Sequence, residues 1–222
     1  MIILEHVSKI YRFGEERIEA LVDINLSIQE KEFVIIQGPS GAGKTTLLNI
    51  IAALDAPTSG TVKVRGVRID GATEVYLSGF RCINIGFVFQ IYNLISTFTA
   101  IENIEFPMEM AGIEAKKTTK RAERILKDIG LTKRAFHLPS QLSGGEQQRL
   151  AFARAIANDP PIILADEPTG NLDRISAQKI VSILNELKHR GKTIVVVSHD
   201  ESTLELADRT VFMQDGRIEN AH

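Results

Sequence analysis

Tryptophan is absent from the 222-residue chain, cysteine occurs once, and no hydrophobic run is long. The single cysteine, Cys82, cannot form a disulfide within the chain, which excludes a disulfide-stapled fold and favours a reducing compartment. Runs such as Ile194-Val195-Val196-Val197 fall far short of the roughly 20 residues that a membrane-spanning helix needs. Residues 1–7 lack the basic segment and apolar stretch of a signal peptide. We therefore expect a soluble chain that reaches a membrane only through a partner.

An excess of basic residues is also missing. Lysine and arginine total 26 against 28 for aspartate and glutamate, so the formal net charge is −2. Because proteins that bind nucleic acids usually carry a strong basic excess, a nucleic-acid partner is not expected. Hydrophobic residues make up 44% and charged residues 24% of the chain, which excludes a disordered or collagen-like protein. A chain of this length can bury about 70% of its unfolded surface, enough for one large domain or two small ones.

β-Strand patterns fill the first and last thirds of the sequence. Residues 22–28 alternate apolar with polar side chains, as in a half-buried strand, and residues 33–36 are apolar throughout, as in a strand covered on both faces. An amphipathic helix that contains Ile180 and Leu187 is expected to end at Gly191. Further strands are expected at 2–7, 161–165 and 193–197, and hairpins at 61–69 and 210–218.

Between residues 91 and 157, helical periodicity replaces the strand patterns. One helix carries an apolar stripe formed by Ala122, Ile125, Leu126 and Ile129. The basic residues around this stripe are interpreted as a solvent-exposed helix face: Lys116, Lys117, Lys120, Arg121, Arg124 and Lys127. We therefore expect one domain, 1–222, in which an α/β core (1–90 and 158–222) is interrupted by a helical insertion (91–157).

The clearest chemical motif is Gly38-Pro39-Ser40-Gly41-Ala42-Gly43-Lys44-Thr45, which lies between the strand at 33–36 and an apolar helix at 47–54. The order G-x-x-x-x-G-K-[ST] in a strand–loop–helix setting is typical of a phosphate-binding loop. Its glycines let successive backbone N–H groups converge on a phosphate, and the helix N-terminus adds partial positive charge. Lys44 is expected to reach the β- and γ-phosphates of a nucleoside triphosphate, and the Thr45 hydroxyl to bind Mg²⁺.

Two adjacent acids, Asp166 and Glu167, follow the buried strand at 161–165. Because parallel α/β sheets bind ligands at the carboxyl ends of their strands, both acids are expected near the phosphates. Adjacent residues at a strand end usually point apart, so the two need different roles. We expect Asp166 to hold the Mg²⁺ through water and Glu167 to orient or deprotonate the attacking water. The sequence therefore predicts an enzyme that hydrolyses a nucleoside triphosphate.

A second anion-binding motif, Leu142-Ser143-Gly144-Gly145-Glu146, opens a helix that runs to about residue 157. Ser143 is a helix-capping type of residue, and the two glycines expose backbone N–H groups at the helix start. Since the first loop already binds one triphosphate, a second anion-binding segment without a lysine predicts a composite site that another subunit completes.

Together these motifs resemble the nucleotide-binding subunits of ATP-binding cassette (ABC) transporters, and the resemblance extends across essentially the whole chain. The segment 142–146 is similar to the family signature, with Glu146 where glutamine is more frequent. The resemblance implies an ATP hydrolase with a P-loop α/β core, an N-terminal antiparallel β-subdomain and an inserted helical subdomain.

The resemblance also implies roles for single residues. Tyr11 is similar to the aromatic residue that stacks on adenine, with Phe13 as a rival for that role. Gln90 is similar to a glutamine that touches Mg²⁺ or water, His199 to a histidine that reaches the γ-phosphate, and Asp173, in Asn171-Leu172-Asp173, to an aspartate of a loop that crosses between subunits. The remaining ATP contacts are expected from Gly38, Ser40, Gly41, Gly43, Lys44, Thr45, Thr46, Ser143, Gly144 and Gly145.

The mechanism that the resemblance implies is a head-to-tail dimer of two copies that encloses two ATP molecules. Each ATP lies between the phosphate loop of one subunit and the signature segment of the other. ATP binding closes the dimer, and hydrolysis reopens it and moves a separate transmembrane permease. We therefore expect a peripheral location at the cytoplasmic face of the membrane. The segment after Gln90, with Ile91, Tyr92, Leu94 and Phe98, is expected to form part of the permease-binding groove.

Three segments, at 87–94, 102–107 and 168–173, resemble the lipoprotein-releasing and macrolide-export cassettes. They imply export or release of a lipoprotein, a peptide or a drug-like substrate. One alternative is the cell-division type of cassette, whose membrane partner relays motion to cell-wall hydrolases. Another is a soluble ABC protein that acts on ribosomes or DNA. The sequence leaves open the cargo, the direction of transport, the permease, and pairing with a copy of itself or with a different cassette.

Overall fold

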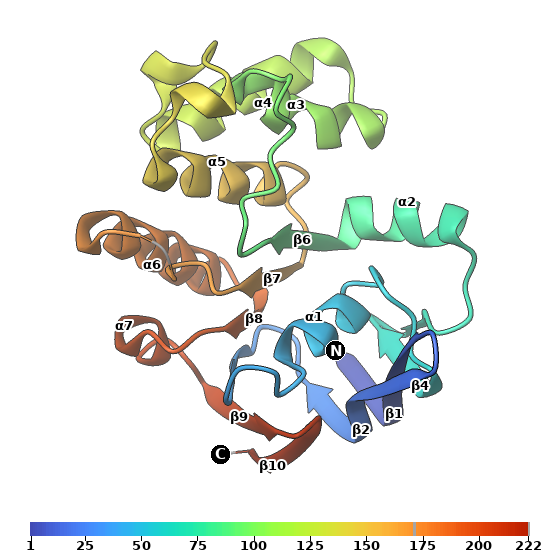
Figure 1. The fold of residues 1–222 in the computed structure, drawn as a ribbon. Helices are drawn as coiled ribbons and strands as arrows, with labels where there is room; N and C mark the ends of the chain where they lie inside the picture. The colour runs from blue at the N-terminus through green and yellow to red at the C-terminus, as the bar shows by residue number, and fades with distance from the viewer. Residues whose placement is uncertain (171, 222) are drawn as a thin grey trace.

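The computed structural model describes residues 1–170 and 172–221, which form two sheets and a group of helices (Figure 1). The larger sheet has six strands in the order β10-β9-β3-β8-β7-β6. Its strands from β9 to β6 are parallel, and β10 pairs with β9 as an antiparallel hairpin. The strands are β3 (Phe33–Gln37), β6 (Ile85–Val88), β7 (Ile162–Asp166), β8 (Thr193–Val197), β9 (Arg209–Gln214) and β10 (Arg217–Ala221).

The central strands are apolar throughout because helices cover both faces of this sheet. Alternate residues such as Val34 and Leu164 pack with α1 (Lys44–Ile51) in one core cluster. The residues between them, such as Ile35 and Ile163, pack in another cluster with α5 (Gly144–Ile156) and α6 (Arg174–His189). A short helix, α7 (Glu201–Leu204), follows β8. The prediction of strands buried on both faces is therefore confirmed.

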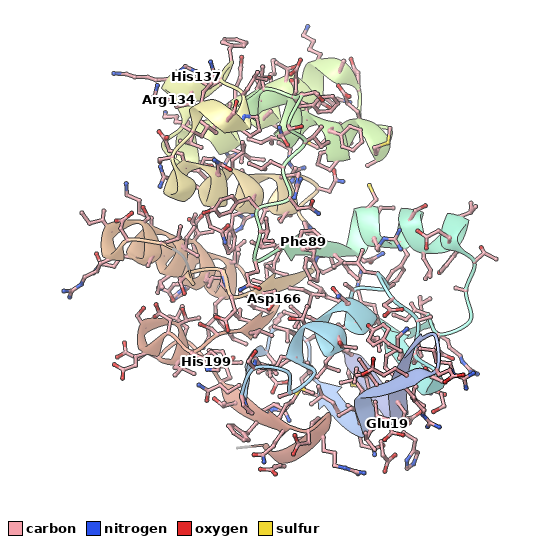
Figure 2. All side chains as sticks on the ribbon, viewed as in Figure 1. Glu19, Phe89, Arg134, His137, Asp166 and His199 are labelled. Atoms are coloured by element: carbon pink, nitrogen blue, oxygen red, sulfur yellow. The ribbon has the colours of Figure 1, made fainter. Side chains whose placement is uncertain are left out.

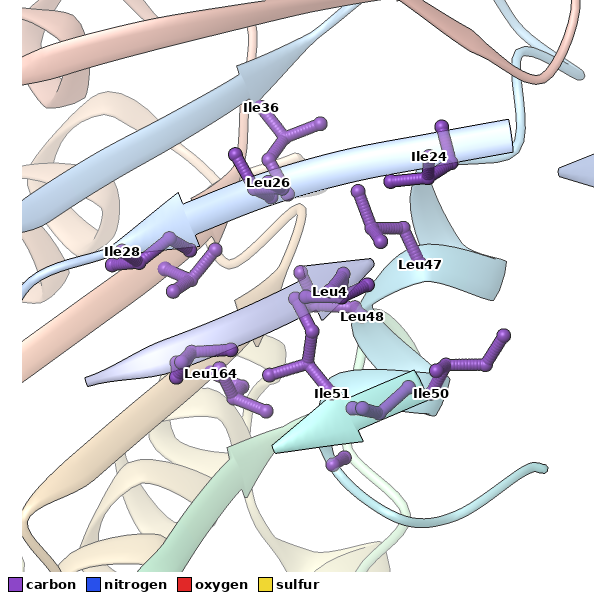
Figure 3. Packing of buried hydrophobic residues seen from close by; sticks show 14 of the residues in the cluster. Leu4, Ile24, Leu26, Ile28, Ile36, Leu47, Leu48, Ile50, Ile51 and Leu164 are labelled. Atoms are coloured by element: carbon purple, nitrogen blue, oxygen red, sulfur yellow. The ribbon is translucent and has the colours of Figure 1, made fainter. Parts of the chain in front are cut away.

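The smaller sheet is antiparallel, in the order β2-β1-β4-β5. Its strands are β1 (Ile2–Phe13), β2 (Glu16–Ile28), β4 (Ser59–Val64) and β5 (Val67–Arg68). Leu4 and Ile24 of this sheet lie beside Leu48 and Leu47 of α1 in one core cluster (Figure 3). The helix that follows the phosphate loop is thus packed between the two sheets. The predicted antiparallel β-subdomain is confirmed.

The helical region consists of α3 (Ala100–Met110), α4 (Ala115–Asp128) and α5, with two 3₁₀ turns, η1 (Thr132–Arg134) and η2 (Pro139–Gln141). The predicted stripe of Ala122, Ile125, Leu126 and Ile129 is buried in a core cluster of this region. Five of the six basic residues around the stripe are exposed and Arg121 is half-buried, which confirms their interpretation as a solvated helix face.

Two features differ from the sequence-based expectation. Helix α2 (Glu74–Asn84) was not predicted; Phe80 is its only buried side chain, although Tyr76, Phe80 and Ile83 recur at helical spacing. Strands β1 and β2 extend beyond the predicted 2–7 and 22–28, and pair as far as Phe13 with Glu16. In this outer part the side chains of residues 16–19 are exposed and those of residues 8–11 are only half-buried, so it carries no alternating apolar pattern. Within the described residues, no helix is both long enough and apolar enough to cross a membrane.

Candidate active site

The phosphate loop is shaped by contacts that exclude side chains at two of its glycines. Gly38 has φ +145°, and a Cβ built there would lie 1.9 Å from the carbonyl oxygen of Met213 in β9. Gly43 has φ +93°, and its Cβ would lie 2.3 Å from the carbonyl oxygen of Ala20 in β2. Both neighbours are backbone atoms, which cannot move aside as the end of a side chain can. The loop is therefore held between the two sheets at positions that only glycine fits.

We expect Gly38→Ala to lower the free energy of unfolding by about 3 kcal/mol or more, because the clash with Met213 adds to the cost of an unfavourable backbone conformation. The matched control is Gly71→Ala, since a Cβ at Gly71 meets nothing within 4 Å and its φ lies outside the left-handed region. Thermal unfolding measures both variants. An equal, small effect of the two substitutions would contradict the close approach of β9 to the loop.

The loop brings an ammonium group, a hydroxyl and a carboxylate together. Lys44 Nζ donates to the carbonyl oxygens of Gly38 at 2.7 Å and Pro39 at 2.8 Å, which places its charge over the loop. Thr45 Oγ1 donates to Asp166 Oδ2 at 2.7 Å across the space between α1 and β7. Burial raises the pKa of Asp166, while the Thr45 hydrogen bond and the charge of Lys44 act in the opposite direction. Thr45 and Asp166, which the sequence analysis expects to bind Mg²⁺, are thus hydrogen-bonded to each other.

Glu167 and His199 lie next to each other at the ends of β7 and β8. Glu167 Oε1 is 3.4 Å from His199 Nε2, and the Glu167 side chain is 21% exposed against 55% for His199. The backbone of Glu167 has φ +44° and donates its N–H to Val197 O at 2.9 Å. Such strain in a residue other than glycine is common where a side chain is aimed at a functional site. Burial raises the pKa of Glu167, which the nearby His199 counteracts, and a raised pKa suits a general base.

These groups surround a cleft of about 370 Å³. Figure 2 labels Glu19 of β2, Asp166 of β7 and His199 in the segment after β8, and all three line this cleft. The sequence analysis missed four residues of the lining: Ile18, Glu19, Ala20 and Val197. The predicted residues in the lining are Ser40, Gly41, Gly43, Lys44, Thr45, Thr46, Gln90, Asp166, Glu167 and His199.

Tyr11 lies outside the residues that line this cleft. Its hydroxyl donates to Asp55 Oδ2 at 2.7 Å, and Lys9 Nζ lies 4.8 Å from the centre of its ring. Burial and the hydrogen bond to Asp55 raise the pKa of Tyr11, whereas a hydrogen bond with Thr46 next to the phosphate loop lowers it. Tyr11 is thereby fixed beside α1, and its stacking on adenine stays a prediction. The side chain of its rival, Phe13, lies outside the described residues.

The signature segment forms the N-terminus of α5, as predicted. Ser143 is the N-cap, and its side chain and that of Glu146 form a reciprocal capping box. A Cβ at Gly145 would lie 2.3 Å from Ser176 Oγ, so α5 begins against the first turn of α6. Asp173 caps α6 and accepts a hydrogen bond from Ser176 Oγ at 2.6 Å. The role of Ser176 behind Gly145 was missed, since only the packing of the two helices reveals it.

Ser143, Gly144, Gly145 and Asp173 are absent from the residues that line the phosphate-loop cleft. Asp173 serves as a helix cap within the chain, and Asn171, named with it in the sequence analysis, lies outside the described residues. Within one chain, the two predicted anion-binding segments are therefore separate sites.

A second cleft, of about 550 Å³, lies between α2, β6, α3 and α5. Its lining is mainly apolar, with Phe87, Phe89, Ile95, Phe106 and Met110 among its residues; Arg154 adds positive charge, whereas Arg81 is ion-paired with Glu74. The predicted groove residues Ile91, Tyr92, Leu94 and Phe98 are not in this lining. Leu94 packs on the core of the helical region and Phe98 against Phe106, with ring centres 5.6 Å apart, because the segment turns toward α3 at once.

Arg154 ties this cleft to the segment after Gln90. Its guanidinium donates to the carbonyl oxygens of Asn93 at 2.6 Å and Tyr92 at 3.2 Å. Burial lowers the pKa of Arg154. Gln90 therefore lies on a segment with one end at the phosphate-loop cleft and the other bound by α5.

The sequence and the structure were both compared with known proteins. Residues 21–170 match the protein family described as ABC transporter. An ABC transporter ATP-binding protein of Thermotoga maritima is 48% identical over 216 residues, 97% of this chain and 92% of the relative. The lipoprotein-releasing system ATP-binding protein LolD of Bacteroides thetaiotaomicron is 48% identical over 219 residues, 98% of this chain and 99% of the relative. The macrolide export ATP-binding/permease protein MacB of Salmonella choleraesuis is 46% identical, over 96% of this chain and 33% of its own length.

A solved structure agrees with this result. The dimeric, post-hydrolysis structure of an ATP-binding cassette of Methanocaldococcus jannaschii, bound to ADP and Pi, has a TM-score of 0.95 and 45% sequence identity. The match covers 100% of this chain and 98% of that one. The fold, the phosphate-loop cleft and these relatives lead to one conclusion: the chain belongs to the ABC transporter family and is one of its ATP-hydrolysing cassettes.

Proposed function

We propose that this cassette is the motor of a transporter that exports or releases a lipoprotein, a peptide or a drug-like substrate. Two copies would enclose two ATP molecules and drive a separate transmembrane permease. The single observation that carries the proposal is the separation of the phosphate-loop cleft from the signature helix within one chain. A site that needs both segments requires a second subunit.

The residues of the phosphate-loop cleft fit Mg²⁺ together with the triphosphate of ATP. Thr45 Oγ1 and Asp166 Oδ2 are hard oxygen ligands 2.7 Å apart, and Gln90 adds a side-chain amide to the same cleft. When bound, the ion neutralises negative charge on the phosphate oxygens. Lys44 would bind the β- and γ-phosphates, and Glu167 would accept a proton from the attacking water. His199, 3.4 Å from Glu167, would contact the γ-phosphate.

The α5 N-terminus supports a role as the second half of an ATP site. Ser143 and Gly144 are exposed there, so a ligand on a partner subunit can reach the Ser143 side chain and the backbone N–H of Gly144, while the Ser143 N–H is held by Glu146. Because the N-terminus of a helix carries partial positive charge, it suits the γ-phosphate of an ATP bound to another subunit. Asp173, at the neighbouring end of α6, would lie at the same dimer interface.

The cleft between α2, α3 and α5 is where we place the permease. Its apolar lining and the charge of Arg154 suit a short amphipathic segment with an acidic residue. Met110 contributes an exposed apolar side chain, 66% accessible, to this cleft. A cassette held there would lie at the cytoplasmic face of the membrane. We also propose the division into an α/β core, 1–90 and 158–222, and a helical subdomain, 91–157, which would move against each other as the dimer closes.

Capture of the native partner tests this function. Tagged Glu167→Gln, with ATP and Mg²⁺, is expected to retain a permease with a large extracytoplasmic domain from solubilised native membranes, as identified by mass spectrometry. Adding Met110→Glu should lower the yield of the permease at least about tenfold, because a charge would be buried in the interface. The matched control is Val75→Glu, since Val75 is 86% exposed on α2 and outside the cleft.

Other partners would contradict the proposal in different ways. A membrane partner that binds cell-wall hydrolases would replace transport by the cell-division function. Ribosomal proteins or DNA-repair factors without a permease would overturn the transporter assignment and also the expectation that no nucleic acid is bound.

A further inference from the structure

Glu146 is a charged residue at a helix end that should attract anions. It is the third residue of α5, and its Oε2 accepts the backbone N–H of Ser143 at 2.8 Å. That hydrogen bond is the main reason why the pKa of Glu146 lies below its ordinary value. The side chain is therefore a carboxylate at neutral pH. It orders Ser143 as part of the capping box, yet it brings a negative charge to the proposed site of a partner's triphosphate.

Arg134 is placed to offset this charge. It lies at the end of η1, and its Nε is 3.3 Å from Glu146 Oε1. Its NH1 group is 3.2 Å from His137 Nε2, and since a guanidinium can only donate, His137 accepts this hydrogen bond. Arg134 and His137 lie together at the tip of the helical region (Figure 2). The guanidinium is thus held between a carboxylate and an imidazole, at a fixed place beside the capping box.

The neighbouring residue lacks these contacts. Lys133 lies on the same 3₁₀ turn and is exposed, but it makes no ion pair with a carboxylate of the described residues. The two residues carry the same charge one position apart. They therefore separate the effect of a specific ion pair from that of positive charge in general.

We propose that Arg134 and Glu146 act as a pair of positioning residues for the signature segment. Glu146 orders Ser143 through the capping box, and Arg134 neutralises Glu146 so that the helix N-terminus can approach the triphosphate bound to the partner subunit. Glutamine at position 146 would cap without charge and needs no such partner. The inference rests on the proposed function, because it assumes that the signature segment completes an ATP site across a dimer.

A double-mutant cycle in the Glu167→Gln background tests the pair. Four proteins are compared: the background itself, Arg134→Ala, Glu146→Gln, and both together. Analytical ultracentrifugation measures dimer dissociation with saturating ATP and Mg²⁺, and a fluorescent ATP analogue measures nucleotide affinity of the monomer. Arg134→Ala alone should weaken the dimer about tenfold, since an uncompensated carboxylate would face the phosphates. Added to Glu146→Gln, it should weaken the dimer less than about twofold, because no charge remains to be offset.

The controls distinguish this effect from simple damage to the fold. Lys133→Ala should change dimer dissociation less than about twofold, and every variant should keep the nucleotide affinity of the monomer. The weakening of the dimer by Arg134→Ala should also decrease as the salt concentration is raised, since exposed charges are screened.

Three results would overturn the inference. In the first, Arg134→Ala weakens the dimer equally whether residue 146 is Glu or Gln, which would make Arg134 a structural residue. In the second, Lys133→Ala weakens the dimer as much as Arg134→Ala does, which would point to positive charge in general instead of the ion pair. The third is the absence of ATP-dependent dimers in the Glu167→Gln background itself, which would remove the proposed function along with the inference. The first two leave the proposed function intact.

Discussion

Replacing Glu167 with glutamine is expected to lower the rate of ATP hydrolysis at least about 100-fold while ATP binding persists. Glu167 lies at the end of β7 in the cleft that holds Lys44 and Thr45, and its side chain is largely buried. Burial raises the pKa of this carboxylate, which makes it a stronger base than an exposed one. Glutamine has nearly the same shape but cannot accept the proton of the attacking water. The variant should therefore bind ATP without hydrolysing it at an appreciable rate.

Steady-state phosphate release and equilibrium binding of a fluorescent ATP analogue measure the two properties. Glu186→Gln is the matched control, because Glu186 is an exposed acid on α6 outside the cleft and should leave both properties unchanged. If Glu167→Gln hydrolysed ATP at the parent rate, Glu167 would not be the general base. A loss of ATP binding in the variant would instead assign the carboxylate to holding the nucleotide or its metal.

The parts of the fold that the sequence predicted correctly are those with a strong local pattern. The strands of the central sheet are short apolar runs, because helices cover both of their faces. The phosphate loop is a fixed order of residues between a strand and a helix, and the α4 stripe repeats with the helical period. In each case the residues that define the element are close together in the chain.

The parts that were missed depend on contacts between distant segments. Ile18 and Ala20 reach the phosphate-loop cleft only because β2 packs across α1, and nothing in their own sequence marks them as site residues. Ser176 lies against Gly145 only because α6 packs on α5. The strained backbone of Glu167 is likewise visible only in the structure.

Replacing Ser143 with arginine is expected to abolish the ATP-dependent dimer and ATP hydrolysis while the monomer still binds ATP. Ser143 is exposed at the start of α5, so the longer side chain fits in the monomer, at a cost of about 1 kcal/mol for the lost cap. In the dimer the same side chain would occupy the space between the helix N-terminus and the partner's phosphates. Light scattering with ATP in the Glu167→Gln background measures dimer formation.

The matched control for this prediction is Ser140→Arg, an exposed serine on the adjacent η2 turn. It introduces the same side chain on the same end of the helical region without touching the α5 N-terminus. It should dimerise as the parent does, because its side chain is not at the helix N-terminus that meets the partner's phosphates. That result would show that added charge and bulk near the interface do not by themselves block closure. If Ser143→Arg also dimerised like the parent, a site shared between two subunits would be wrong. The separation of the phosphate-loop cleft from the signature helix would then need another explanation.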